Sequence, residues 1–278
     1  MVKILDTMKT WRDYPILQHG KYSYRGTWDD ALFDKSIAVV GSRRITRYGH
    51  DCIEKILPDI IANKVTIISG FMYGVDTIAH SCALKYGGKT IAVLGSGLNY
   101  LYPLENDNLY TQIIETGGLV LSIFPSDFLP TLWSFPQRNK EVVSLSTLGV
   151  LVIEASIKSG SLITAKLALK AGKSVYAIPG PITSTVSYGT NYLIKNGLAQ
   201  AVLSSQDILP DLCTTQLSLD LSDPILQFLQ NEALSIDELL FKTKLSLSDL
   251  STKLTKLSFE DKIDEQNGKF FLVPKGNR

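Results

Sequence analysis

Short apolar runs recur from residue 35 to residue 205, and each is followed by small residues and then by a stretch with helical spacing. Uninterrupted apolar runs are typical of parallel strands that are buried on both faces. We expect strands at 37–40, 65–69, 90–94, 119–124, 150–154 and 174–178, and a weaker one at 201–203. The stretches between them predict helices at 49–62, 75–86, 105–115, 140–146, 161–171 and 191–196. Strands that alternate with helices predict a Rossmann-like, doubly wound α/β domain with a mostly parallel sheet.

The two ends of the chain differ from this pattern. Residues 1–34 carry aromatic side chains without periodicity, and predict a lead-in segment that lays these rings on the main domain. The composition of residues 210–222 predicts a linker. The chain is therefore expected to hold a large domain at 35–209 and a small domain at 223–278.

The small domain has its own pattern. Leucines at helical spacing predict helices at 223–230, 235–244 and 247–258. An Asn267-Gly268 turn predicts a hairpin that joins 263–265 to 270–273. Three helices and a hairpin predict a winged helix.

Charge is distributed unevenly along the chain. The formal net charge is +1, with a balance of 0 over residues 1–34, +4 over 35–210 and −3 over 211–278. An anion-binding surface is therefore expected in the middle of the chain. The winged helix offers Lys253 and Lys256 on its expected recognition helix. Because this domain is acidic overall, duplex binding and protein contact both remain open for it.

The composition excludes several classes of protein. No apolar run approaches the roughly 18 residues that span a bilayer, so we expect no membrane contact. Cys52, Cys82 and Cys213 are scattered without a CxxC motif, and the three histidines are dispersed. This pattern predicts a cytoplasmic protein with neither disulfides nor a metal site.

Small and basic residues gather where the predicted strands end. The first strand runs into Gly41, Ser42, Arg43 and Arg44. Small residues let a ligand approach backbone N–H groups, and guanidinium groups match phosphate oxygens. Several such loops at the carboxyl edge of one sheet predict a phosphate-binding pocket. The alternative for the first loop alone is an ordinary strand-to-helix turn with solvated arginines.

Between residues 35 and 205 the chain carries an ordered set of motifs: GSR, SG-x5-D-x3-H, LGSGL, YP, RN, EA-x3-SGSLITA, PG and S-x-G-x-N-x-LI. This set resembles the DNA-processing protein A family (DprA/Smf). The resemblance implies a protein that binds single-stranded DNA, forms a homodimer and loads a RecA-type recombinase during natural transformation. It implies no catalytic residue and no cofactor. The chain departs from the family pattern at Phe71-Met72-Tyr73, where Leu-Ala is usual, and at Ile123, where Glu is frequent.

The resemblance also implies which residues bind the phosphates. They are Gly41, Ser42, Arg43, Arg44, Ser69, Gly70, Arg138, Asn139, Lys140, Ser159, Gly160, Ser161 and Thr164. Four of these have an alternative. Ser161 and Thr164 are also suited to capping a helix, Lys140 to a solvated helix surface, and Arg138 to bracing the fold through a carboxylate such as Glu154. Phe135 or Tyr188 is a candidate for stacking on bases.

Three ionisable residues are candidates for catalytic groups. Asp76 and His80 share a helical face, but no second carboxylate or histidine accompanies them, which favours structural roles. Glu154 is expected to pair with Arg138. The alternative function is an enzyme that acts on nucleotides, similar to the lysine-decarboxylase-like phosphoribohydrolases. Those enzymes carry a catalytic glutamate in a PGGxGTxxE loop, and the corresponding loop at 159–164 has none in register.

Overall fold

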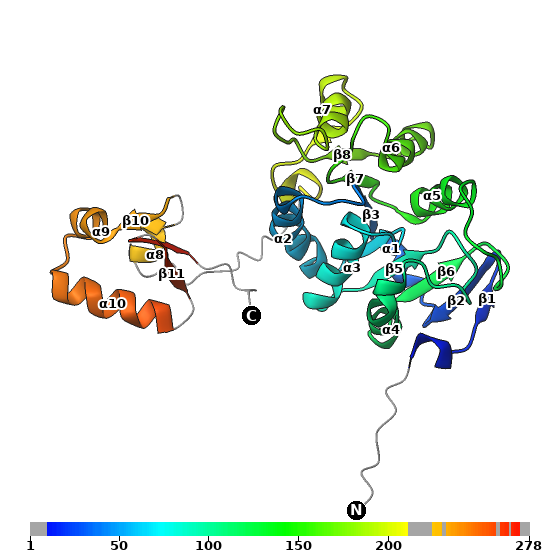
Figure 1. Ribbon diagram of the computed structural model, residues 1–278, viewed down its shortest axis with the longest axis horizontal. Helices are drawn as coiled ribbons and strands as arrows, with labels where there is room; N and C mark the ends of the chain where they lie inside the picture. The colour runs from blue at the N-terminus through cyan, green and yellow to red at the C-terminus, as the bar shows by residue number, and fades with distance from the viewer. Residues whose placement is uncertain (1–9, 211–223, 230–231, 260–261, 267, 273–278) are drawn as a thin grey trace, which may run out of the picture. The chain divides into compact units, whose positions relative to one another are not determined.

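The computed structural model in Figure 1 describes residues 10–210, 224–229, 232–259, 262–266 and 268–272. It divides into two compact units, Met1–Thr214 and Thr215–Arg278, and each is described by itself. The predicted linker at 210–222 lies outside the described residues except for Pro210.

The first unit is built on a nine-stranded sheet of order β1-β2-β6-β5-β4-β3-β7-β8-β9. Its strands are β1 (Leu17–His19), β2 (Tyr22–Gly26), β3 (Ser36–Val40), β4 (Thr66–Ser69), β5 (Thr90–Val93), β6 (Leu119–Ser122), β7 (Val150–Val152), β8 (Val175–Ala177) and β9 (Gln200–Ala201). Strands β3 to β9 are parallel, whereas β1 and β2 are antiparallel. The predicted α/β fold with a mostly parallel sheet is confirmed.

Helices cover both faces of this sheet (Figure 1). They are α1 (Ala31–Asp34), α2 (Arg47–Ala62), α3 (Val75–Lys85), α4 (Asp107–Glu115), α5 (Ser134–Leu145), α6 (Gly160–Lys170) and α7 (Tyr188–Lys195). The alternation of side chains along β3 shows how the two faces are filled. Ile37 and Val39 pack with residues of α2 and α3, and Ala38 and Val40 pack with residues of α5 and α6. All four are buried because a helix layer lies on each side.

The chain reverses its direction of travel across the sheet between β3 and β7. From β3 it proceeds through β4 and β5 to β6, crosses back through α5, and continues through β7 and β8 to β9. The carboxyl ends of β3 and β7 are therefore neighbours, and their connections diverge to opposite sides. Ligands of doubly wound sheets bind at such a switch point.

Two predictions for the first unit need correction. Residues 1–34 were expected to form a lead-in, but Tyr22–Gly26 is strand β2, which lies between the edge strand β1 and β6 in the sheet. The expected aromatic packing does occur, since Trp11 is buried and its Nε1 donates to Asp107 Oδ1 at 2.6 Å. The helix predicted at 140–146 begins at Ser134, because Pro136 falls in its first turn, where a missing N–H costs nothing.

The second unit consists of α8 (Pro224–Leu229), α9 (Ile236–Thr243) and α10 (Leu247–Phe259) with a three-stranded antiparallel sheet. The strands are β10 (Leu234–Ser235), β11 (Ile263–Gln266) and β12 (Lys269–Leu272), in the order β10-β12-β11. Leu239, Leu250 and Phe270 belong to its buried core. Gly268 has a φ of 76°, as the predicted turn requires. The predicted helices and hairpin are present, and β10 adds a short third strand.

Candidate functional site

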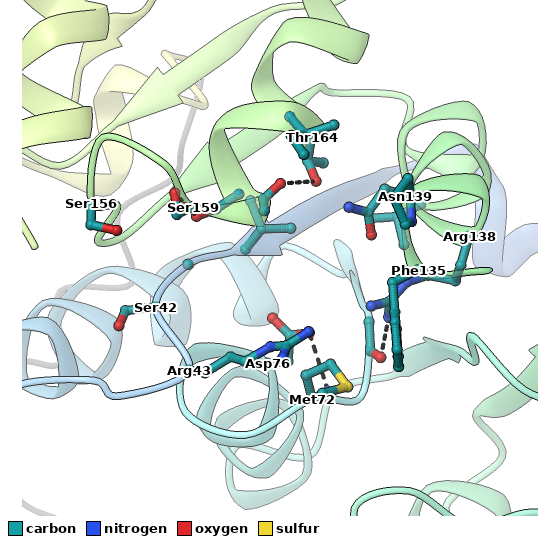
Figure 2. A pocket seen from close by; sticks show the side chains of 18 of the residues that line it. Ser42, Arg43, Met72, Asp76, Phe135, Arg138, Asn139, Ser156, Ser159 and Thr164 are labelled. Atoms are coloured by element: carbon teal, nitrogen blue, oxygen red, sulfur yellow. Dashed lines mark hydrogen bonds between the residues drawn. The ribbon is translucent and has the colours of Figure 1, made fainter. Parts of the chain in front are cut away.

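A cavity of about 460 Å³ opens at the switch point between β3 and β7 (Figure 2). Four segments line it: the loop after β3, the loop between β4 and α3, the first half of α5, and the loop after β7 with the start of α6. Residues from distant parts of the sequence meet here because every parallel strand delivers its following loop to the same edge of the sheet.

The structure brings ten of the thirteen predicted phosphate-binding residues to this cavity. They are Gly41, Ser42, Arg43, Gly70, Arg138, Asn139, Ser159, Gly160, Ser161 and Thr164. Figure 2 shows Arg43 beside Asp76 and Met72, Arg138 and Asn139 beside Phe135, and Ser159 and Thr164 on the α6 side.

The other three predicted residues do not line the cavity. The Ser69 hydroxyl is buried and donates to Val39 O at 2.6 Å, so it holds β4 against β3. Arg44 is exposed, and its backbone N–H donates to Ser42 Oγ at 3.1 Å. Lys140 is exposed on α5, where its Nζ donates to Gln137 Oε1 at 2.9 Å.

The loop after β3 is fixed against the start of α3. The Val75 N–H donates to Ser42 O at 3.1 Å, and a Cβ at Gly41 would clash with Val75. Arg43 is exposed, and its guanidinium lies 5.6 Å from the centroid of the Phe135 ring. The loop therefore presents an accessible cation at the cavity, and the aromatic face helps to hold it there.

A buried pair of opposite charges forms the floor. The Arg138 guanidinium donates to Gly70 O and, at 2.9 Å, to Val93 O, and only 4% of the residue is exposed. Burial lowers the pKa of Arg138 to about 10, and the nearby charge of Asp76 opposes this shift. Burial also raises the pKa of Asp76, while Arg138 opposes that shift. Arg138 therefore joins the ends of β4 and β5, and its charge is balanced largely inside the protein.

Glu154 does not pair with Arg138, so this prediction is wrong. Its carboxylate accepts a hydrogen bond from Thr46 N at 3.0 Å and another from Thr46 Oγ1. Thr46 precedes α2, and Glu154 thus fixes the start of that helix. Glu154 is 1% exposed and does not line the cavity.

Asp76 and His80 have the structural contacts that were expected. Asp76 Oδ2 accepts a hydrogen bond from Met72 N at 3.2 Å, just before α3 begins. His80 Nδ1 lies 2.6 Å from Thr90 Oγ1 in the interior. Asp76 also reaches the cavity wall, whereas His80 does not.

The start of α6 faces the cavity with its positive end. Ser159 is the N-cap and accepts from Leu162 N at 3.4 Å, and the Ser161 hydroxyl donates to Ser159 Oγ at 2.9 Å. The Thr164 hydroxyl donates to Gly160 O at 3.3 Å. A Cβ at Gly160 would meet no heavy atom within 4 Å, so a ligand can approach the backbone at this point.

Sequence reasoning missed the apolar part of the wall. It is formed by Val40, Met72, Leu132, Pro136, Val142 and Ile163. Leu132, one of these residues, is 92% exposed. The site thus combines a cation and a helix N-terminus with apolar contacts, a set that suits an anion attached to an organic group.

Within the residues that the structure describes, no group of three or more His, Cys, Asp or Glu side chains is placed to hold a metal ion. No helix in the same ranges is long and apolar enough to cross a membrane.

Comparison with known proteins gives matches over most of the chain. The family model for DNA recombination-mediator protein A matches residues 7–213, and the model for the DprA winged helix domain matches residues 214–269. The chain is 43% identical over 182 residues to Protein Smf of Escherichia coli, covering 66% of this chain and 48% of that protein. It is 41% identical over 213 residues to DNA processing protein DprA of Streptococcus pneumoniae, covering 75% of this chain and 72% of that protein.

Two solved structures are similar in fold as well as in sequence. DprA of S. pneumoniae aligns with a TM-score of 0.65 at 37% identity, over 73% of this chain and 75% of that one. DNA processing protein A of Helicobacter pylori aligns with a TM-score of 0.61 at 32% identity, over 71% of this chain and 89% of that one. The H. pylori structure is described in terms of its single-stranded DNA binding mode.

Proposed function

This chain belongs to the DNA recombination-mediator protein A family (DprA/Smf) of DNA-processing proteins, and on that premise we propose that it binds single-stranded DNA at the switch-point cavity. The observation that carries the proposal is the meeting of an exposed arginine, Arg43, with the N-terminus of α6 at one cavity. Both attract phosphate. The H. pylori relative supports the choice of single-stranded DNA as ligand.

The size of the cavity indicates how a strand binds. At about 460 Å³, the cavity has room for more than a phosphate group. We propose that one nucleotide unit enters it, with its phosphate between Arg43 and the start of α6. Its base or sugar then contacts the apolar wall, and Phe135 stacks on a base. Tyr188, the other candidate for stacking, does not line the cavity.

We further propose that the protein works in the cytoplasm as a homodimer that loads a RecA-type recombinase onto the bound strand. The description of the matching family as recombination mediators supports this role. Homologous recombination, including natural transformation, is the process that such loading serves. The strand held at the sheet edge would be handed to the recombinase.

The geometry favours binding over catalysis. Glu154, the candidate catalytic acid, uses its carboxylate to hold Thr46 and lies outside the cavity lining. Asp76 is the carboxylate that reaches the cavity, and burial raises its pKa. Among the residues that the structure describes, no second carboxylate lines the cavity to act with Asp76 as an acid–base pair. We therefore propose no enzymatic activity for this site.

Salt dependence tests the proposed contacts with phosphate. Replacement of Arg43 with Ala is expected to weaken binding to a labelled dT oligonucleotide and to flatten the plot of log affinity against log salt by about 0.7. Lys140→Ala is expected to act in the same way as an outer contact. Arg47→Ala is the matched control, because this exposed arginine begins α2 and does not line the cavity. Fluorescence anisotropy at several salt concentrations gives both quantities. Unchanged affinity and slope in Arg43→Ala would remove the cavity from the binding mechanism.

A further inference from the structure

A row of three aromatic rings leads away from the cavity. Phe135 lines the cavity from α5, Tyr102 lies in the loop after β5, and Tyr73 lies in the loop after β4. The ring centroids of Phe135 and Tyr102 are 6.4 Å apart, and those of Tyr102 and Tyr73 are 6.2 Å apart. We call Phe135, Tyr102 and Tyr73 the aromatic row.

The two outer rings are open to solvent although they touch each other. Tyr102 is 42% exposed and Tyr73 is 37% exposed. The Tyr73 hydroxyl donates to Glu105 Oε2 at 2.9 Å, which fixes the direction of that ring. The planes of the two rings meet at 80°. Exposed aromatic side chains that are held in place in this way are suited to binding another flat, apolar surface.

Charge along the row distinguishes its two ends. Arg43 lies over Phe135 at the cavity end, whereas the Glu105 carboxylate lies at the Tyr73 end. A phosphate is attracted at the first end and repelled at the second. A nucleobase has no negative charge, and its amino groups are able to donate to a carboxylate.

We propose that Tyr102 and Tyr73 form a base-stacking extension of the cavity, which takes bases of the single strand that leaves it. This inference rests on the proposed function, since it assumes that a strand is held at the cavity. Bases stack on aromatic rings with little regard to sequence, because every base has a π-face. The cavity then fixes the backbone through charge, and the outer rings hold the neighbouring bases through stacking.

Stacking and phosphate contacts respond differently to salt. Counterions are released when a cation binds phosphate, but not when a base stacks on a ring. Loss of the two tyrosines is therefore expected to lower affinity at every salt concentration without changing the slope. Loss of Arg43 changes the slope. The two contributions are separable in one titration series.

The test uses the full chain and two labelled oligonucleotides of equal length, one of dT and one of abasic units. The double variant Tyr73→Leu/Tyr102→Leu keeps apolar bulk but removes both π-faces. It is expected to lose about tenfold or more in affinity for dT and to bind the abasic oligonucleotide as the wild type does. The matched double variant Tyr73→Phe/Tyr102→Phe keeps both rings and is expected to retain the affinity for dT. Thermal melting confirms that both variants are folded.

Three results would overturn this assignment while leaving the proposed function intact. They are an unchanged affinity for dT in the leucine variant, an equal loss on both oligonucleotides, and impaired recombinase loading with normal DNA affinity. The last result would assign the row to a protein partner. Failure of the proposed function looks different, because the wild-type protein would then bind neither oligonucleotide or Arg43→Ala would leave the salt slope unchanged.

Discussion

Two of the glycines that line the cavity, Gly70 and Gly160, have opposite surroundings. Substitutions at these two positions therefore distinguish an effect on stability from an effect on DNA binding. A Cβ at Gly70 would overlap the Arg138 guanidinium, which cannot move aside easily because it is buried and bonded to Gly70 O and Val93 O. A Cβ at Gly160 would meet no heavy atom within 4 Å. Neither residue has a positive φ, so only the space around the new methyl group matters.

Gly160→Ala is therefore expected to leave stability within about 0.5 kcal/mol of the wild type. It is also expected to weaken oligonucleotide binding severalfold, because the methyl group projects where a strand would approach the backbone. Gly70→Ala is expected to cost about 1–3 kcal/mol through overpacking. Urea denaturation and anisotropy measure the two effects. Normal DNA affinity in Gly160→Ala would show that the strand does not approach the start of α6.

His80 gives the protein a pH dependence of known sign. Thr90 Oγ1 donates to Ile67 O at 2.7 Å, so it accepts a hydrogen bond from His80 Nδ1. Burial lowers the pKa of His80 to about 3, and the charge of Arg138 acts in the same direction. The unfolded chain, with a pKa near 6.5, then binds the extra proton, so stability is complete above about pH 6.5 and falls as the pH drops towards 3.

The expected loss from this residue is about 2 kcal/mol between pH 7 and pH 5. His80→Asn keeps a donor near Thr90 but does not titrate, so the variant is expected to lose less stability over that range. His50→Asn is the control, since His50 is exposed. Urea unfolding at both pH values gives the difference. A wild-type protein and a His80→Asn variant with the same pH dependence would show that the imidazole does not carry the effect.

At the scale of elements, burial decided what was predictable from the sequence. The seven parallel strands each begin within one residue of the predicted start. In β3 to β7 every residue is buried, because both faces of the sheet are covered there, and such burial favours the apolar runs that the sequence shows. Strand β2 was missed, since it carries Ser23 and Arg25 and gains its burial only by pairing with β6. Helix α5 begins before the predicted residue 140, because Pro136 lies in its first turn and does not interrupt the helix.

The residues that line the cavity were also predictable only in part. Its small and basic residues, such as Arg43 and Gly160, were found because those residue types are informative where a strand ends. Its apolar wall was not found, because Met72 and Ile163 look like ordinary core residues along the sequence. Because α5 begins at Ser134, Lys140 lies inside the helix and not at its start. Its side chain therefore lies outside the cavity, although Arg138 and Asn139 line it.

Strand β2, which pairs with the edge strand β1, depends on a buried arginine. Arg25 is 5% exposed and donates to Tyr14 O at 2.9 Å, to Asn99 Oδ1 at 3.2 Å and to Leu98 O. Arg25→Ala is expected to destabilise the protein by about 3 kcal/mol, because the loss of the guanidinium leaves Leu98 O unpaired in the interior and removes the other two bonds. Lys21→Ala in the same hairpin removes an ion pair with Glu141 but is expected to cost less than about 1 kcal/mol, since Lys21 is exposed. Equal losses in the two variants, measured by urea denaturation, would show that Arg25 does not anchor the strand.

At the scale of the whole molecule, the two units have separate cores and separate charge. The cavity and the aromatic row lie wholly within residues 1–214. The second unit has its own buried cluster, and residues 211–278 have a balance of −3. The proposed site for single-stranded DNA therefore lies in the first unit, and the second is expected to add little through charge alone.

A protein truncated after Thr214 is expected to bind a dT oligonucleotide within about twofold of the full chain, because the residues that line the cavity and form the aromatic row all belong to the first unit. Its salt slope is expected to be unchanged, since Arg43 and the start of α6 remain. The residues 215–278, expressed alone, are expected to melt cooperatively and to bind neither single-stranded nor duplex DNA tightly at physiological salt. Tight duplex binding by this fragment would give the winged helix a DNA-binding role, which its acidic balance argues against. A large loss of single-strand affinity in the truncated protein would mean that the second unit takes part in the site, either directly or by bringing two copies of the chain together.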